Sequence, residues 1–97
     1  MPTYIMLLNW TDEGVRNVKD SPTRLDAFKQ ALQQAGGELK GFYMVTGQYD
    51  MIAIAEAPDD ETLIKVGLAS QAKGSIRATT LRAFTEDEYG KIIGALP

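Results

Sequence analysis

The segment Tyr4–Trp10, with the sequence YIMLLNW, is apolar at almost every position. Successive side chains of a β-strand point to opposite faces of its sheet, so a strand of this composition needs cover on both faces. Strands are also predicted over Leu39–Thr46, Tyr49–Ala57 and Ser75–Phe84, and each carries apolar residues on both sides. Any fold of this chain must therefore bury both faces of one sheet.

Two helices are predicted between these strands. Residues 21–37 begin with Ser-Pro, where serine is a favourable N-cap and proline fits the first turn, and they end with Gly-Gly, a typical helix end. Residues 57–74 carry Asp59 or Asp60 as the N-cap and Gly74 as the stop. Each helix is long enough to cover part of one face of the sheet.

A short helical turn capped by Thr11 follows the first strand, and a last helix begins at the capping box of Thr85 and Glu88. The resulting order, β-α-β-β-α-β-α, predicts an α+β protein. We expect a ferredoxin-like βαββαβ unit with a four-stranded antiparallel sheet and an extra C-terminal helix. The length of 97 residues suits one domain, so we expect residues 1–97 to form a single domain.

This architecture leaves one face of the sheet bare. The two long helices cover one face, while the other face would expose an apolar patch larger than monomers usually tolerate. We therefore expect a homodimer that packs sheet against sheet, a dimeric α/β barrel, with a higher oligomer of such dimers as a further option.

The pair Gly47–Gln48 is typical of a two-residue type II′ hairpin, which prefers glycine first. Such a turn sets the register between the two strands that it joins. Tyr43 then lies opposite Ile52, and Val45 lies opposite Asp50. Tyr43 and Asp50 are therefore predicted to be diagonal neighbours on one face of the sheet.

These positions supply the candidate site. Asp50 is the candidate catalytic base or ligand anchor, Tyr43 lies within its reach, and Arg82 is expected beside Asp50 to hold an anion. Tyr49 and Trp10 are further ligand-binding candidates, with Trp10 expected at the opposite edge, where it would close a cavity mouth. A structural alternative stands beside each role: Asp50 would then accept hydrogen bonds from backbone amides or pair with an arginine.

The chain contains neither cysteine nor histidine. The absence of cysteine excludes disulfides, thiolate nucleophiles and thiolate metal sites, and the absence of histidine removes the commonest metal ligand and the usual base near neutral pH. We therefore expect no metal site and no cofactor. Any catalysis by this chain would rely on carboxylates, lysine, arginine, tyrosine or backbone groups.

The charge pattern also restricts the partners. The formal net charge is −3, and no cluster of lysine and arginine stands out, so the electrostatic footprint of a nucleic-acid-binding protein is missing. No apolar run approaches the roughly 20 residues of a membrane-spanning helix, and no signal peptide is visible. We expect a cytoplasmic protein that binds copies of itself, and a small molecule as the remaining option, but no nucleic acid or membrane.

Several segments together resemble a known family. The hairpin GQYD, preceded by FYMVT and followed by MIAIAEAPDDE, is similar to the signature of the GYD-domain family, and so are YIMLLNWTDEGVRNVKDSPTR, FKQALQQAGGELKGFY and LRAFTEDEY. The resemblance implies a dimeric α/β barrel built from ferredoxin-like units. It marks Gly47, Tyr49 and Asp50 as signature positions but implies no established activity. Haem and metal enzymes of the wider superfamily depend on histidine, which this chain lacks.

The sequence leaves open whether the protein is an enzyme. The first hypothesis is a homo-oligomeric, non-enzymatic module that binds a small molecule or serves in assembly. The alternative is a small cofactor-free oxygenase or isomerase, acting on an apolar or phenolic compound with Asp50 as the base. It requires a pocket of at least about 300 Å³ that reaches Asp50. A third option is a subunit that contacts another protein through an exposed sheet edge.

Overall fold

The computed structural model describes residues 1–97 as a four-stranded antiparallel sheet with helices. The strands lie in the order β2-β3-β1-β4, with β1 and β3 in the centre. The strands are β1 (Thr3–Trp10), β2 (Glu38–Met44), β3 (Met51–Glu56) and β4 (Ile76–Ala83). The helices are α1 (Asp12–Arg16), a 3₁₀ turn (Val18–Asp20), α2 (Ser21–Gln34), α3 (Asp60–Gln71) and α4 (Glu86–Gly94). The ferredoxin-like α+β fold with its extra C-terminal helix is confirmed.

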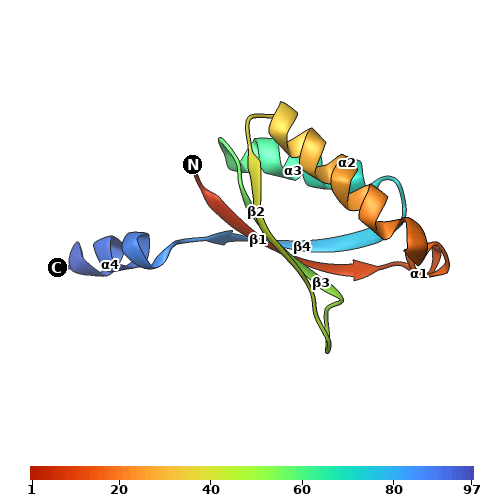
Figure 1. Ribbon diagram of the computed structural model, residues 1–97. Coiled ribbons are helices and arrows are strands. Elements are labelled where there is room, and N and C mark those ends of the chain that lie inside the picture. Colours follow the sequence, from red (N-terminus) through yellow and green to blue (C-terminus); the bar gives the residue numbers. More distant parts are fainter.

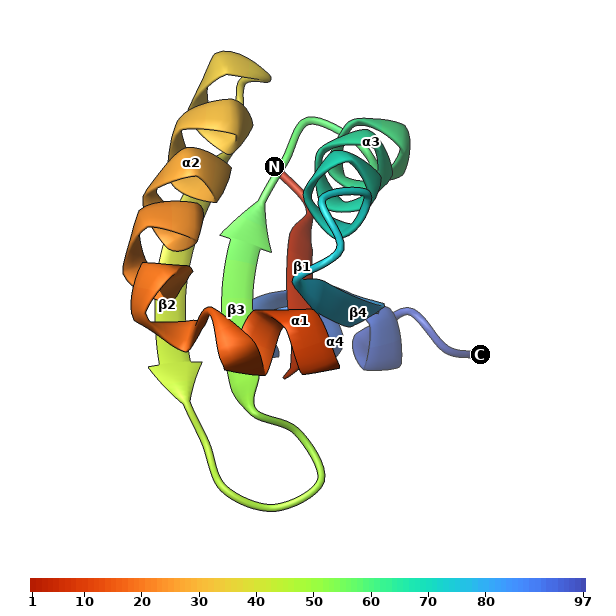
Figure 2. The same ribbon diagram turned by 90° about the vertical axis from the view of Figure 1, so that its right-hand side faces the viewer.

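Helices α2 and α3 lie side by side on one face of the sheet (Figures 1 and 2). Helix α3 begins where predicted, because the Asp59 side chain accepts a hydrogen bond from the Thr62 amide. Helix α2 begins one residue earlier than a Ser21 cap implies: Asp20 is its N-cap, and Ser21 is already helical because the 3₁₀ turn leads directly into the helix. No helix in the structure has both the length and the apolar character needed to cross a membrane.

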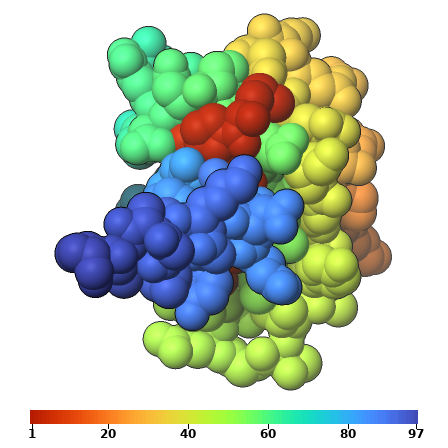
Figure 3. All heavy atoms as spheres, turned by 90° about the vertical axis from the view of Figure 1, so that its left-hand side faces the viewer, coloured from red at the N-terminus to blue at the C-terminus, as the bar shows by residue number.

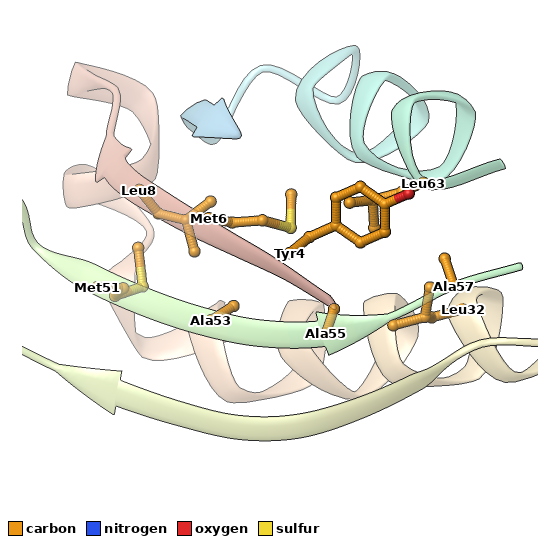
Figure 4. Close-up of a cluster of buried hydrophobic side chains, with 9 residues drawn as sticks. All are labelled: Tyr4, Met6, Leu8, Leu32, Met51, Ala53, Ala55, Ala57 and Leu63. Atoms are coloured by element: carbon orange, nitrogen blue, oxygen red, sulfur yellow. The ribbon is translucent and has the colours of Figure 1, made fainter. Parts of the chain in front are cut away.

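The core lies between these helices and the sheet (Figure 4). Alternate residues of β1 and β3 point into it, and Leu32 of α2 and Leu63 of α3 meet them from the helix layer. The inward residues of the central strands are Tyr4, Met6, Leu8, Met51, Ala53 and Ala55. The strand period of two therefore sorts the apolar residues of β1 and β3 between two faces.

The opposite face, here called the open face, has no helix over it. The register aligns Tyr43, Ile52 and Leu7 in one cross-strand row and Ile54, Ile5 and Leu81 in the next. Tyr43 is 61% exposed and Leu81 is 45% exposed. The prediction of a sheet that is apolar on both faces is confirmed, whereas the sheet-to-sheet dimer remains a prediction.

Helix α4 leaves the body of the molecule at the end of β4 (Figure 1), and its atoms lie in front of the body when the molecule is viewed from that end (Figure 3). The predicted capping box is confirmed, since the Thr85 hydroxyl accepts from the Glu88 amide and the Glu88 carboxylate accepts from the Thr85 amide. An exposed apolar stripe runs along the helix at the spacing of one helical face. Its members are Tyr89, Ile92 and Ile93, and the exposed Leu96 follows just beyond the end of the helix.

The β2–β3 connection differs from the predicted two-residue turn. The predicted pairing of Tyr43 with Ile52 is confirmed, but the ladder ends one pair later and leaves the six residues Val45–Asp50 as the connection. Gly47 has φ +104°, the positive value expected of a glycine in a turn. Val45 and Asp50 still face each other as predicted, since the Val45 amide donates to the Asp50 carbonyl at 2.8 Å, while the Asp50 amide donates to the Leu8 carbonyl of β1 at 2.9 Å.

Candidate functional site

A groove opens between α2, α3 and the inner face of the sheet. The space that it encloses is about 80 Å³, below the roughly 300–1,000 Å³ of drug-sized ligand pockets, and it opens to solvent, so a bound molecule would lie partly in its mouth. Figure 2 shows β3 in the opening between the two helices. Small residues help to create this space: beside Met51, β3 contributes Ala53, and α3 contributes Gly67, where an added Cβ would come within 3.4 Å of the Met6 side chain.

Most of the groove wall is apolar. The side chains come from all the elements that surround it, so the wall exists only in the folded chain. They are Met6, Leu8, Leu25, Phe28, Phe42, Met51, Ala53 and Ile76. Two methionines and two phenylalanines among them provide an adaptable surface for an apolar molecule.

The polar residues of the groove come from the start of α2, from the end of α3 and from the loop between α3 and β4. They are Ser21, Arg24, Ser70, Lys73 and Ser75. The groove therefore has two cationic side chains in its lining and no carboxylate. Neither cation belongs to an ion pair, because the two salt bridges of the structure join Lys40 to Glu38 and Lys65 to Glu61.

Arg24 is partly committed to the fold. Its Nη1 donates to the Asn17 carbonyl at 3.0 Å, and its Nη2 lies 3.4 Å from the Gly14 carbonyl. Its Nε is buried and has no hydrogen-bond partner. A buried guanidinium donor without a partner is unfavourable, and it gains from any acceptor that reaches it.

A second hollow adjoins the groove and shares Ser21, Leu25, Phe42 and Met51 with it. Trp10 lines this hollow, and its indole Nε1 lies 3.4 Å from the Ser21 hydroxyl oxygen. The structure therefore places Trp10 next to the groove. Trp10 is the only tryptophan of the chain, which makes its fluorescence a specific reporter for this region.

Asp50 lies outside both hollows. Its Oδ2 accepts a hydrogen bond from the Trp10 amide at 3.0 Å, while its own amide donates to the Leu8 carbonyl. Tyr43 is on the open face, and Tyr49 is half-buried in the β2–β3 connection. Neither hollow is lined by Asp50, Tyr43 or Tyr49, so the pocket that the enzyme hypothesis requires is not found at Asp50.

The predicted proximity of Arg82 to Asp50 is wrong. Arg82 pairs with Tyr4 at the start of β1, whereas Asp50 bonds to the residues at the end of β1. Strands β3 and β4 are both antiparallel to β1, so they run parallel to each other and the start of β3 lies near the start of β4. For the same reason Trp10 shares an edge with Asp50 instead of lying opposite. The Arg82 guanidinium lies 4.4 Å from the centroid of the Phe84 ring.

The buried Tyr4 was not among the site residues predicted from the sequence. The Tyr4 hydroxyl donates a hydrogen bond to Asp60 Oδ1 in the first turn of α3. Burial raises the pKa of Tyr4 to about 12, and the hydrogen bond to Asp60 acts in the same direction. The contact joins β1 to α3 and lies away from the groove, which has neither residue in its lining.

Arg24, Lys73 and the serines of the groove were not predicted from the sequence. The available signal was indirect: the segment MIAIAEA places small alanines on one side of a central strand, and small residues leave space above them. The helix positions that border this space follow only from the observed packing of α2 and α3.

Comparison with known proteins found a matching family and a relative of similar length. The description "GYD domain" matches residues 4–93. A Thermus thermophilus protein named "Glutamine synthetase and cystathionine beta-lyase binding protein" is 33% identical over 84 residues, which covers 86% of this chain and 88% of the relative.

Solved structures share the fold. The crystal structure of TTHA0845 from Thermus thermophilus has a TM-score of 0.54 and 25% identity, covering 88% of this chain and 95% of the other. A feast or famine regulatory protein from M. tuberculosis has a TM-score of 0.63 at 16% identity, covering 90% of this chain and 54% of the other. At that identity the second likeness concerns the fold alone.

Proposed function

Because the chain belongs to the GYD-domain family, we propose that it is a non-enzymatic binding module that holds a small apolar molecule in the groove between α2 and α3. The observation that carries the proposal is the groove itself, with its apolar wall and its space above Ala53. The module assembles with further copies of the chain through the open face.

The chemistry of the groove supports binding over turnover. A base or a nucleophile with an activating partner is the usual minimum for proton-transfer or covalent catalysis. Ser70 and Lys73 lie three residues apart, but no hydrogen bond joins their side chains, and Lys73 is exposed. Asp50 is engaged by backbone groups at a place outside the groove.

The binding proposal is tested with a neutral apolar probe. We expect 1-octanol to change Trp10 fluorescence in a saturable manner in the wild type. Ala53→Leu should fill the floor and abolish this response, while Ala27→Leu, on the exposed side of α2, should leave it intact. Circular dichroism confirms that both variants are folded. Absence of saturable binding to the wild type, or full binding to a folded Ala53→Leu variant, contradicts the proposal.

Self-association rests on the open face and on α4. Two neighbouring apolar surfaces, the rows around Leu81 and the stripe of α4, follow each other along the chain through β4 and the exposed Phe84. An isolated helix of nine residues with Gly90 and Gly94 is marginal in water, so α4 gains stability from a surface that covers its stripe. A second copy of the chain offers such a surface.

A second candidate function is the binding of another protein. The Thermus thermophilus relative is named as a binding protein for glutamine synthetase and cystathionine β-lyase. Under this candidate the open face contacts such a partner. Purified glutamine synthetase and cystathionine β-lyase, mixed with the wild type and with Leu81→Asp, provide the test: binding that is lost in the variant favours this function, and absence of binding to both enzymes removes it.

A further inference from the structure

We propose that the ligand of the groove is an apolar molecule with an anionic head group, of which a carboxylate is the simplest, and that Arg24 and Lys73 bind this head. The inference rests on the proposed binding function and adds the chemical class of the ligand. It follows from three independent properties of the groove: its charge, its unused donor and the position of its cations.

The charge of the groove opposes that of the chain. The chain carries 13 acidic against 10 basic side chains, yet the groove is lined by two cations and no acid. Arg24 is partly buried, so its charge is less screened than that of a fully exposed side chain, while the exposed Lys73 adds a weaker, salt-sensitive attraction; together they favour anions. Neutral and cationic molecules lack this attraction.

The donor groups of Arg24 are incompletely used. Two of its nitrogens face the carbonyls of Asn17 and Gly14, which hold the guanidinium in place but do not neutralise it. The buried Nε remains without a partner. A carboxylate oxygen would supply a charge-assisted hydrogen bond, the stronger class, and would remove the cost of the unpaired donor.

The two cations lie at the same end of the groove. Arg24 reaches the carbonyl of Gly14, and Gly14 packs so closely on Ser75 that an added Cβ would come within 2.0 Å of the Ser75 carbonyl oxygen. Lys73 is two residues before Ser75. The hydroxyls of Ser70 and Ser75 line the same groove and offer further donors to an oxyanion.

The apolar wall continues from this end. Phe28 is one helical turn beyond Arg24 on α2, and Gly67 is about one turn before Ser70 on α3, facing Met6. A ligand with its head at Arg24 and Lys73 therefore extends its tail over Met6 towards Phe28. The arrangement suits an unbranched or aromatic tail, since the floor at this point is Ala53 and the ceiling is open between the helices.

The test compares three probes of equal tail length: octanoate, 1-octanol and octylamine. Binding to the full chain is followed by Trp10 fluorescence and calorimetry. We expect octanoate to bind at least about ten-fold more tightly than octanol, and octylamine to bind most weakly. Arg24→Gln should abolish the preference for octanoate over octanol, whereas Arg16→Gln, at an exposed arginine of α1, should retain it.

Arg24→Gln also removes the contacts to Asn17 and Gly14, so Lys73→Gln serves as the second variant. Lys73→Gln should reduce the preference for octanoate over octanol. In the wild type, increasing the salt concentration should reduce the same preference. Equal binding of octanoate and octanol to the wild type, or tighter binding of octylamine, overturns this inference but leaves the proposed binding function standing. If none of the three probes binds, the proposed function fails and the inference fails with it.

Discussion

The backbone amide of Trp10 donates a hydrogen bond to Asp50 Oδ2 over 3.0 Å, and the Asp50 amide donates to the Leu8 carbonyl over 2.9 Å. The acid that precedes β3 thus continues the pairing of β1 after the ladder to β3 has ended. These contacts support a structural role for Asp50, in which its carboxylate accepts a hydrogen bond from the Trp10 amide beyond the end of the ladder between β1 and β3.

We expect Asp50→Ala to lower the free energy of unfolding by about 1–3 kcal/mol, because the Trp10 amide loses its acceptor. Asp50→Asn keeps an oxygen at this position and should cost less. Urea denaturation of both variants measures the difference. Equal losses in the two variants would contradict the role of the side-chain oxygen as the acceptor.

Tyr4 predicts a loss of stability at alkaline pH. Burial raises its pKa from 10.0 to about 12. Between these values the unfolded chain releases a proton that the native chain retains, so the free energy of unfolding falls as the pH rises through this window, whereas the contribution is fully present below pH 10. Tyr4→Phe should remove this part of the pH dependence. The exposed Tyr43→Phe is the control, and urea unfolding at each pH gives the comparison; an unchanged alkaline loss in Tyr4→Phe would refute the assignment.

Gly14 lies where α1 meets the segment before β4, and there is no room for a larger side chain at this position. Its missing side chain allows the close approach of the Ser75 carbonyl, 2.0 Å from the position of an added Cβ. We expect Gly14→Ala to destabilise the fold by roughly 1–3 kcal/mol through overpacking. Gly90→Ala in α4, where an added Cβ meets nothing within 4 Å, should have no such effect. Thermal unfolding of the two variants separates them, and similar melting temperatures would rule out the clash.

Leu81, on the open face, allows a test of the proposed self-association. A charge on the open face should prevent sheet-to-sheet packing but leave the monomer folded, because Leu81 is already 45% exposed. We expect Leu81→Asp to be monomeric by light scattering. Leu68→Asp, on α3 at 58% exposure, should keep the assembly state of the wild type. A wild type that is itself monomeric at high concentration would disprove the assembly proposal.

The sequence was sufficient for the fold because each element carries its own local signals. The cap at Asp59, the box of Thr85 and Glu88, and the alternation in β1 all act over a few residues, and the structure retains them. The pairing of Tyr43 with Ile52 likewise follows from a short connection between neighbouring strands.

The site could not be predicted in the same way, because it depends on which ends of distant elements meet. Arg82 was expected near Asp50, although the parallel relation of β3 and β4 places it at the other end of β1. Arg24 and Lys73 come together only through the relative placement of α2 and α3 on the sheet. The spacing of residues within the sequence does not reveal how the two helices are placed relative to each other.

The floor of the groove at Ala53 belongs to β3, whereas Arg24 and Lys73 belong to the helix layer and its following loop. Under the proposed function, the tail and the head of the ligand would therefore contact different parts of the chain. A residue larger than Ala53 would fill the floor while Arg24 and Lys73 stay unchanged. Under this proposal a single codon of β3 would therefore decide whether a tail is admitted, without any change to the residues that bind the head.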